Sequence, residues 1–113
     1  MPYIDVTTNI SLDKEEIDAL KADLGDAISL IPGKSESWLM INIRDSAALF
    51  FQGSGDKAAM FDVSIFGSAD GGAYDELTKR ICAISADKLG VPADRIYVKY
   101  SEYTHWGWNG MNF

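Results

Sequence analysis

Cysteine and positive charge are both scarce in this sequence, and each shortage excludes a class of protein. The single cysteine, Cys82, cannot form an internal disulfide or a four-cysteine metal site. Ten Lys and Arg residues stand against 17 Asp and Glu residues, so the formal net charge is −7. No stretch gathers the cations that bind nucleic-acid phosphates, so we expect no nucleic-acid partner. Taken alone, the excess of acids also argues against an anionic small-molecule ligand.

Long hydrophobic runs are absent as well. The longest uncharged stretch, Ser46 to Gly55, is too short to cross a bilayer. The N-terminus lacks the basic run and apolar core of a secretory signal, since Asp5 and Asn9 interrupt it. We therefore expect no membrane partner and a cytoplasmic location. With 47% hydrophobic residues, the chain is expected to fold, and residues 1–113 are expected to form one domain.

The first part of the chain changes from a strand pattern to a helix pattern and back. Residues 3–8 alternate between two faces, as expected for a strand. A helical spacing follows, with Ser11 or Asp13 as its cap and Pro32-Gly33 as its end. The apolar face of this helix consists of Ile17, Leu20, Leu24, Ile28 and Ile31. A second strand is expected from Trp38 to Arg44.

The second half of the chain repeats this order. A strand is expected from Met60 to Phe66, a helix from Tyr74 to Leu89 and another strand from Arg95 to Tyr103. Ile4-Asp5-Val6 in the first half matches Phe61-Asp62-Val63 in the second. This match indicates that one β-α-β unit was duplicated.

The duplication predicts an α/β chain of the α+β kind. The tandem β-α-β repeat should form a four-stranded mixed sheet with two helices on one face, because right-handed crossovers place both helices there. Between the units, Ala47 to Gln52 should be a short apolar strand, followed by a turn at residues 53–56. The other sheet face should be bare and expose Trp, Phe, Met and Ile side chains. Since a monomer does not tolerate a large patch of that kind, we expect an obligate oligomer.

Pro2 is the first candidate catalytic residue. Within a chain a proline nitrogen is an amide, but removal of Met1 would make Pro2 an N-terminal secondary amine. An α-amino group titrates near neutrality, and burial or a nearby cation lowers its pKa further, which suits a general base. A proline after the initiator is also simply common, so its position alone does not decide this role.

Two lysines are candidate substrate-binding cations. Lys34 follows Pro32-Gly33 at the end of the first helix, where a solvated lysine also suits the helix dipole. Lys99 lies in an apolar strand, and alternation places Tyr97, Lys99 and Ser101 on one face. The tyrosine hydroxyl and the ammonium therefore either line one wall of a pocket or lie on a strand face exposed to water.

The chain ends in an aromatic segment from His105 to Phe113. So much aromatic surface is not expected to remain in water, so we expect this tail to dock on another subunit. His105 could act there as a base or a metal ligand. It has no nearby Cys, His or paired carboxylates, so no metal site is expected.

Several short motifs, spread over nearly the whole chain, are specific when they occur together. They are Pro2, Thr8-Asn9, Gly33-Lys34, Gly53-Ser54, Ser64-Ile65-Phe66-Gly67, Pro92-Ala93-Asp94-Arg95-Ile96-Tyr97 and the ending Gly107-Trp108-Asn109-Gly110-Met111-Asn112-Phe113. As a set they resemble the macrophage migration inhibitory factor (MIF) family of the tautomerase superfamily.

This resemblance implies a homotrimer in which the sheets form a central barrel with three active sites at subunit interfaces. It also implies keto-enol tautomerisation of arylpyruvates such as phenylpyruvate, and of dopachrome-like compounds, without a cofactor. By position, Pro2 would be the catalytic base, Lys34 would bind the substrate carboxylate and the backbone N–H of Phe66 would add a hydrogen bond. Tyr97 of the neighbouring subunit would close the pocket.

Other positions would shape this pocket. Trp108 and Phe113 would build its apolar rim. The family usually has an asparagine two residues after the pocket tyrosine, and this chain has Lys99 there. Lys99 would either bind the substrate carboxylate as a second cation or change which substrate is accepted. Lys34, Lys99 and the amine of Pro2 would then form a local cationic pocket, which the net charge of −7 does not oppose.

The resemblance also implies an alternative function. Relatives include cytokine-like proteins that are secreted without a signal peptide. The alternative is therefore a receptor-binding protein that keeps a vestigial tautomerase pocket and meets a host or cell-surface receptor. The cysteine pair of many relatives is replaced here by Ala58-Ala59-Met60-Phe61, so no thiol-disulfide activity is expected.

Overall fold

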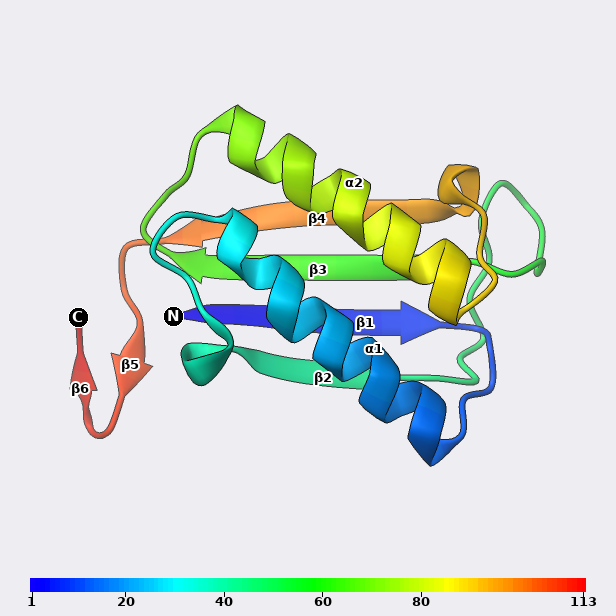
Figure 1. Cartoon of the computed structure of the whole chain (residues 1–113), viewed down its shortest axis with the longest axis horizontal. Helices are drawn as coiled ribbons and strands as arrows, with labels where there is room; N and C mark the ends of the chain where they lie inside the picture. The colour runs from blue at the N-terminus through cyan, green and yellow to red at the C-terminus, as the bar shows by residue number, and fades with distance from the viewer.

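Two helices and a four-stranded sheet make up the body of the chain, in a computed structural model that describes residues 1–113 (Figure 1). The main elements are β1 (Pro2–Thr8), α1 (Lys14–Ala27), β2 (Met40–Arg44), β3 (Ala59–Phe66), α2 (Gly71–Lys88) and β4 (Ile96–Tyr103). The tail adds a small hairpin of β5 (Gly107–Trp108) and β6 (Met111–Asn112). Every strand and helix of the two predicted β-α-β units is present.

The strand order confirms the internal duplication. The sheet runs β2-β1-β3-β4, with an antiparallel pair at the centre and a parallel pair on each side. Asp5 lies opposite Asp62 in the central pair, so the matching motifs face each other across an approximate twofold axis. The predicted mixed sheet is therefore correct.

Capping side chains define where both helices start. Asp13 accepts a hydrogen bond from the N–H of Glu16 at 2.8 Å, and the Glu16 side chain accepts one in return, which is a complete capping box. The helix α1 passes into a single 3-10 turn at Ile28–Leu30, so the regular helix is shorter than predicted. Asp70 caps α2, which therefore begins before the predicted Tyr74.

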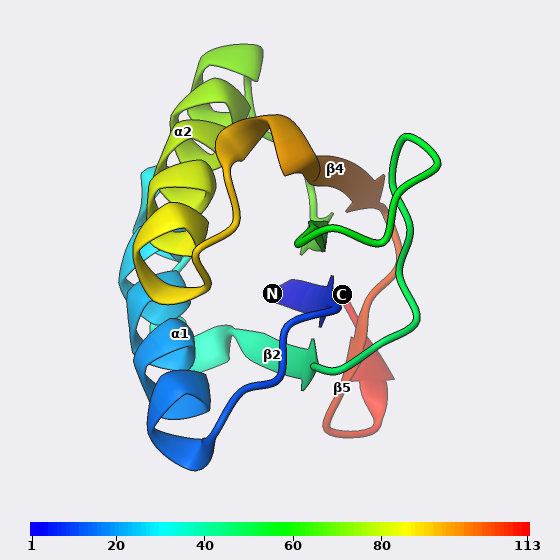
Figure 2. The ribbon, with the colours of Figure 1, turned by 90° about the vertical axis from the view of Figure 1, so that its right-hand side faces the viewer.

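Both helices cover the same face of the sheet, as predicted (Figures 1 and 2). Burial alternates strictly along β1 and β3, so every second side chain enters the core. The largest fully buried side chains come from both helices and both central strands: Phe61, Ile4, Leu20, Leu24, Ile28, Ile31, Ile65, Leu77 and Ile81. This core fixes the register of β1 against β3, and with it the positions of residues at the strand ends.

The open face of the sheet is more polar than predicted. Ile41 and Ile43 of β2 pack against the core, so they do not contribute to the open face. A row of paired residues crosses that face: Asn42, Asp5, Asp62 and Lys99. The expectation of exposed Ile side chains is wrong, because alternation directs the β-branched residues inward. Met40, Met60 and Phe66 do lie on the open face beside the charged row, and Met40 is 68% exposed.

Residues 47–52 do not form the predicted strand. The segment contains only an isolated bridge between Phe51 and Ser54, and it pairs with no strand of the chain. The N–H of Ala47 donates to the carbonyl of Thr8 at 3.0 Å, and the carbonyl of Leu49 accepts from the Asn9 side chain at 3.1 Å. Hydrogen bonds from the Asn9 side chain and to the Thr8 backbone therefore hold this segment in place of pairing with a neighbouring strand.

Candidate active site

Pro2 begins β1 at the end of the sheet where β3 finishes. It is buried and pairs with Ile65, so the next residue of β3, Phe66, lies beside the N-terminus. The N–H of Phe66 donates to the carbonyl oxygen of Met1 at 3.0 Å. Removal of Met1 would therefore free the Pro2 nitrogen and the Phe66 N–H at the same place.

Lys34 comes from the segment after α1 and lies beside Phe66 and the N-terminus. A turn after α1 carries it there, and Gly33 adopts a φ of 80° that a side chain would disfavour. The ammonium of Lys34 donates to the carbonyl oxygen of Phe66 at 2.8 Å. Two adjacent groups of β3, the N–H and the C=O of Phe66, thus bind the N-terminal residue and the lysine.

The groups around the N-terminal amine change its pKa. Burial, and then the neighbouring Lys34 cation, lower the pKa of the Met1 amine below its ordinary value. Both causes disfavour a positive charge at this position. They would act in the same way on an amine at Pro2, one residue further into the sheet.

The aromatic tail contacts its own chain, and its expected docking on another subunit stays a prediction, since Trp108, Met111 and Phe113 remain about half or more exposed. The hairpin turns at Asn109 and Gly110, whose φ angles of 54° and 82° suit an Asn-Gly turn. Trp108 meets Trp38 edge-on, with 5.0 Å between ring centroids. Phe113 lies 5.6 Å from the ring of Phe66, which brings the tail next to Pro2.

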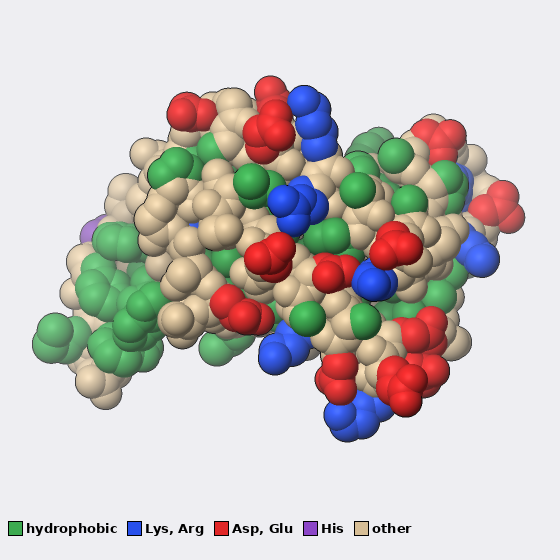
Figure 3. Space-filling model, in the orientation of Figure 1, with side chains coloured by type: hydrophobic (Ala, Val, Ile, Leu, Met, Phe, Trp, Pro, Cys, Tyr) green, Lys and Arg blue, Asp and Glu red, His purple; other side chains and the backbone are tan.

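A cavity of about 720 Å³ opens beside Pro2, on the surface that the tail helps to build. Its lining residues are Met1, Pro2, Tyr3, Ser37, Trp38, Leu39, Met40, Ser64, Tyr103, His105, Trp106, Gly107 and Trp108. All three tryptophans of the chain belong to this lining. Hydrophobic side chains gather over the tail in Figure 3, at the end of the molecule where β5 and β6 lie in Figure 1. The cavity therefore offers an aromatic wall next to the N-terminus.

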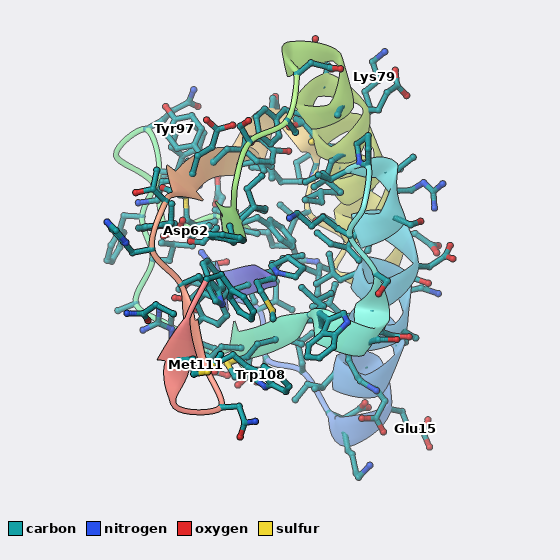
Figure 4. The ribbon with its side chains drawn as sticks, turned by 90° about the vertical axis from the view of Figure 1, so that its left-hand side faces the viewer. Glu15, Asp62, Lys79, Tyr97, Trp108 and Met111 are labelled. Carbon is teal, nitrogen blue, oxygen red and sulfur yellow. The ribbon has the colours of Figure 1, made fainter.

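Two predicted site residues, Tyr97 and Lys99, lie elsewhere. Tyr97 pairs with Met60, five positions before Ile65, which corresponds to about 17 Å along the strand. Lys99 lies 3.4 Å from the carboxylate of Asp62, on the open face of the sheet. Figure 4 shows Tyr97 well separated from Trp108. Within one chain, neither residue reaches the cavity at Pro2.

Sequence reasoning missed two features of the cavity. Trp38 is not the start of a strand, as predicted, but ends a 3-10 turn at Glu36–Trp38 and packs against the tail. His105, a candidate base in the sequence, lines the cavity. The tail hairpin itself was missed, and Asn109-Gly110 is the signal that could have predicted it. No group of three or more His, Cys, Asp or Glu side chains is placed to hold a metal ion.

Comparison with known proteins shows the family of this chain. The sequence model of the family described as macrophage migration inhibitory factor (MIF) matches residues 1–113. The chain belongs to the MIF family. It therefore belongs to the tautomerase superfamily, as the motifs predicted.

Individual relatives agree over the full length. The macrophage migration inhibitory factor of Xenopus laevis is 30% identical over 115 residues, which cover 100% of this chain and 99% of the relative. The crystal structure of Leishmania major MIF2 has a TM-score of 0.93 at 35% identity, covering 100% of this chain and 97% of that one. Pt0534, solved after inactivation by 2-oxo-3-pentynoate, has a TM-score of 0.86 at 14% identity, covering 97% of this chain and 95% of that one. At this identity, the likeness to Pt0534 shows the shared fold alone.

Neither helix has both the length and the apolar character needed to cross a membrane.

Proposed function

We propose that the chain is a keto-enol tautomerase of arylpyruvates such as phenylpyruvate, and of dopachrome-like compounds, with Pro2 as the general base. The observation that carries this proposal is the meeting of three groups at one point: the Pro2 nitrogen, the Lys34 ammonium and the Phe66 N–H. An arylpyruvate has a carboxylate, an adjacent ketone and an acidic C–H, and these three groups provide a partner for each.

The binding step uses the cations and the aromatic wall. The substrate carboxylate pairs with Lys34, whose position is set by the 2.8 Å hydrogen bond to the Phe66 carbonyl. The aryl group lies against Trp108 and Phe113, which pack on Trp38 and Phe66. The Phe66 N–H, free once Met1 is removed, donates to a substrate oxygen.

The chemical step moves one proton from carbon to oxygen. The neutral Pro2 amine takes a proton from the carbon next to the ketone, and the electron pair of that C–H bond forms the C=C bond. The carbonyl electron pair moves to oxygen, which takes the proton back from the Pro2 ammonium to give the enol and regenerate the neutral amine. A base of depressed pKa suits this step because it is neutral near physiological pH, and nearby donors stabilise the developing enolate.

The site is completed by a second copy of the chain. Because Tyr97 lies toward the opposite end of the sheet and Lys99 lies at its middle, they reach a Pro2 cavity only in a neighbouring subunit. A closed homotrimer, in which each open sheet face turns inward, brings these ends together. Tyr97 then closes the pocket, and Lys99 provides a second anchor for an anionic group.

The decisive experiment compares chains that differ only at the N-terminus. Phenylpyruvate enol-keto exchange is followed by ultraviolet absorbance for the protein with Met1 removed, for the protein with Met1 retained and for Pro2→Gly, after intact-mass measurement of each sample. Retention of Met1 should lower the rate about 10²- to 10⁴-fold, the range for a lost general base. Equal rates for wild type and Pro2→Gly would show that the proline has no catalytic role.

A further inference from the structure

Two side chains hold the loop of residues 49–58, and one of them, Arg95, precedes Tyr97 by two residues. The Arg95 guanidinium donates to four backbone carbonyl oxygens of this loop: Phe51 at 2.8 Å, Asp56 at 3.0 Å, Ser54 at 3.2 Å and Lys57 at 3.2 Å. A guanidinium has several N–H donors in one rigid plane, so it can bind several carbonyls at once. The loop is thus wrapped around Arg95.

Asn9 holds the same loop from the end of β1. Its amide nitrogen donates to the carbonyls of Leu49, Gly55 and Asp56, and its oxygen accepts from the N–H of Ala58 at 3.0 Å. Inside the loop, the backbones of Phe51 and Ser54 exchange hydrogen bonds of 2.9 and 3.0 Å across a tight turn. Most carbonyls between residues 49 and 57 therefore have a defined partner.

Phe51 links this loop to Tyr97. The guanidinium carbon of Arg95 lies 5.2 Å from the centroid of the Phe51 ring, which is the geometry of a cation–π contact. The Tyr97 ring meets the same Phe51 ring edge-on, with 4.7 Å between centroids. The Tyr97 side chain is otherwise largely free, since the residue is 63% exposed. Figure 4 shows Tyr97 next to this loop, on the side of the sheet away from the helices.

We propose that Arg95 is the positioning residue of Tyr97, and that it acts through the loop and the ring of Phe51. This inference rests on the proposed function, in which Tyr97 closes the cavity of the neighbouring subunit. Arg95 does not touch the substrate; it fixes the ring on which Tyr97 rests. Substrate affinity in one subunit thereby depends on an arginine at the far end of the next subunit's sheet.

Two variants test separately the contact of Arg95 with the loop and the contact of Phe51 with Tyr97. Arg95→Lys keeps the positive charge but loses the planar set of donors, so it cannot bind the carbonyls of Phe51, Ser54, Asp56 and Lys57 together. Phe51→Leu keeps the backbone hydrogen bonds to Arg95 and removes only the aromatic ring. Arg80→Lys is the matched control, because Arg80 is a surface arginine of α2 whose nearest carboxylate is that of Asp26 at 3.5 Å.

The first measurement is independent of turnover. Hydrogen exchange of the amides of residues 51–58 should become about tenfold faster in Arg95→Lys, and stay at the wild-type rate in Phe51→Leu and Arg80→Lys. The NMR signals of the Tyr97 ring should move toward those of a solvent-exposed tyrosine in Arg95→Lys and in Phe51→Leu, but not in Arg80→Lys. Tyr97 signals that stay in place in Arg95→Lys would overturn the inference.

The second measurement links the position of Tyr97 to substrate binding. In Arg95→Lys and Phe51→Leu the KM for phenylpyruvate should rise about tenfold, with kcat within about twofold and the oligomer mass unchanged. A displaced Tyr97 ring with an unchanged KM would overturn the link to the pocket. A wild-type protein without turnover would contradict the proposed function instead, and the exchange and NMR results would still decide whether Arg95 positions Tyr97.

Discussion

The proposed chemistry depends on a few single residues, and strand register brings them together. Pro2 and Phe66 become neighbours because Pro2 pairs with Ile65 in the central antiparallel pair. Lys34 joins them through a glycine turn and a hydrogen bond to Phe66. The sequence named all three residues, but it contained no distance between them, because register depends on packing of the whole core.

Replacement of Lys34 should change both substrate binding and pH dependence. In Lys34→Ala the KM should rise about tenfold, since the carboxylate loses its ion pair. The pKa of the N-terminal amine should also rise toward its ordinary value, because Lys34 is one cause of its depression. Since the base acts when neutral, the acidic limb of the pH profile of kcat/KM should move to higher pH, and activity should fall more at pH 6 than at pH 9.

Two controls make this result specific. Lys21→Ala removes an exposed lysine of α1 and should leave both KM and the pH profile unchanged. Lys34→Arg keeps the charge, so its acidic limb should stay near that of the wild type. An unchanged KM in Lys34→Ala would count against the carboxylate role, and an unmoved acidic limb would count against the electrostatic one.

The elements differ in how well the sequence predicted them. Each helix and sheet strand was predicted because a long hydrophobic period shows which face is buried. The segment Ala47–Gln52 has the same apolar character, but it finds no neighbouring strand in its own chain and is held by Asn9 and Arg95 instead. The β5–β6 hairpin has too few residues for a period, and only Asn109-Gly110 marks it.

The hairpin turn gives a prediction at this scale. Gly110 has a φ of 82°, so Gly110→Ala should cost about 1–2 kcal/mol locally and loosen the hairpin. Because the hairpin builds the rim and not the core, the KM should rise while the urea midpoint changes little. Tryptophan emission should shift to the red as Trp108 loses its contact with Trp38.

The matched control uses another glycine. Gly71 begins α2, and a Cβ added there would meet nothing within 4 Å. Gly71→Ala should leave the KM, the emission spectrum and the urea midpoint near their wild-type values. If Gly110→Ala behaves in the same way as Gly71→Ala, the hairpin does not shape the pocket.

At the scale of the whole molecule, one chain carries two separate halves of the proposed site. Pro2 and the aromatic cavity lie at one end of the sheet, Tyr97 lies toward the other, and Lys99 lies at the middle. The open face carries a polar row that includes Lys99, together with Met40, Met60 and Phe66. The proposed trimer is therefore favoured by the need to complete three sites.

Mixed oligomers test whether the site is shared between subunits. Pro2→Gly and Tyr97→Ala should each have low activity alone, by kcat for the first and by KM for the second. When equal amounts are unfolded and refolded together, about one site in four should combine Pro2 of one subunit with Tyr97 of the next, so activity should reappear. The mass in solution should be three times the 12.4 kDa of one chain. Activity no higher than the mean of the two separate variants would contradict a shared site.

The sequence by itself determined the family and the duplicated β-α-β order, and it named the residues proposed to carry the chemistry, because these follow from local motifs and from hydrophobic periods. The tertiary structure decided which of these residues meet. In the structure Pro2 and Lys34 lie close together, Tyr97 lies toward the far end of the sheet, and the tail contacts its own chain. Such distances depend on strand register, turn geometry and side-chain packing over the whole chain, and no local pattern contains them.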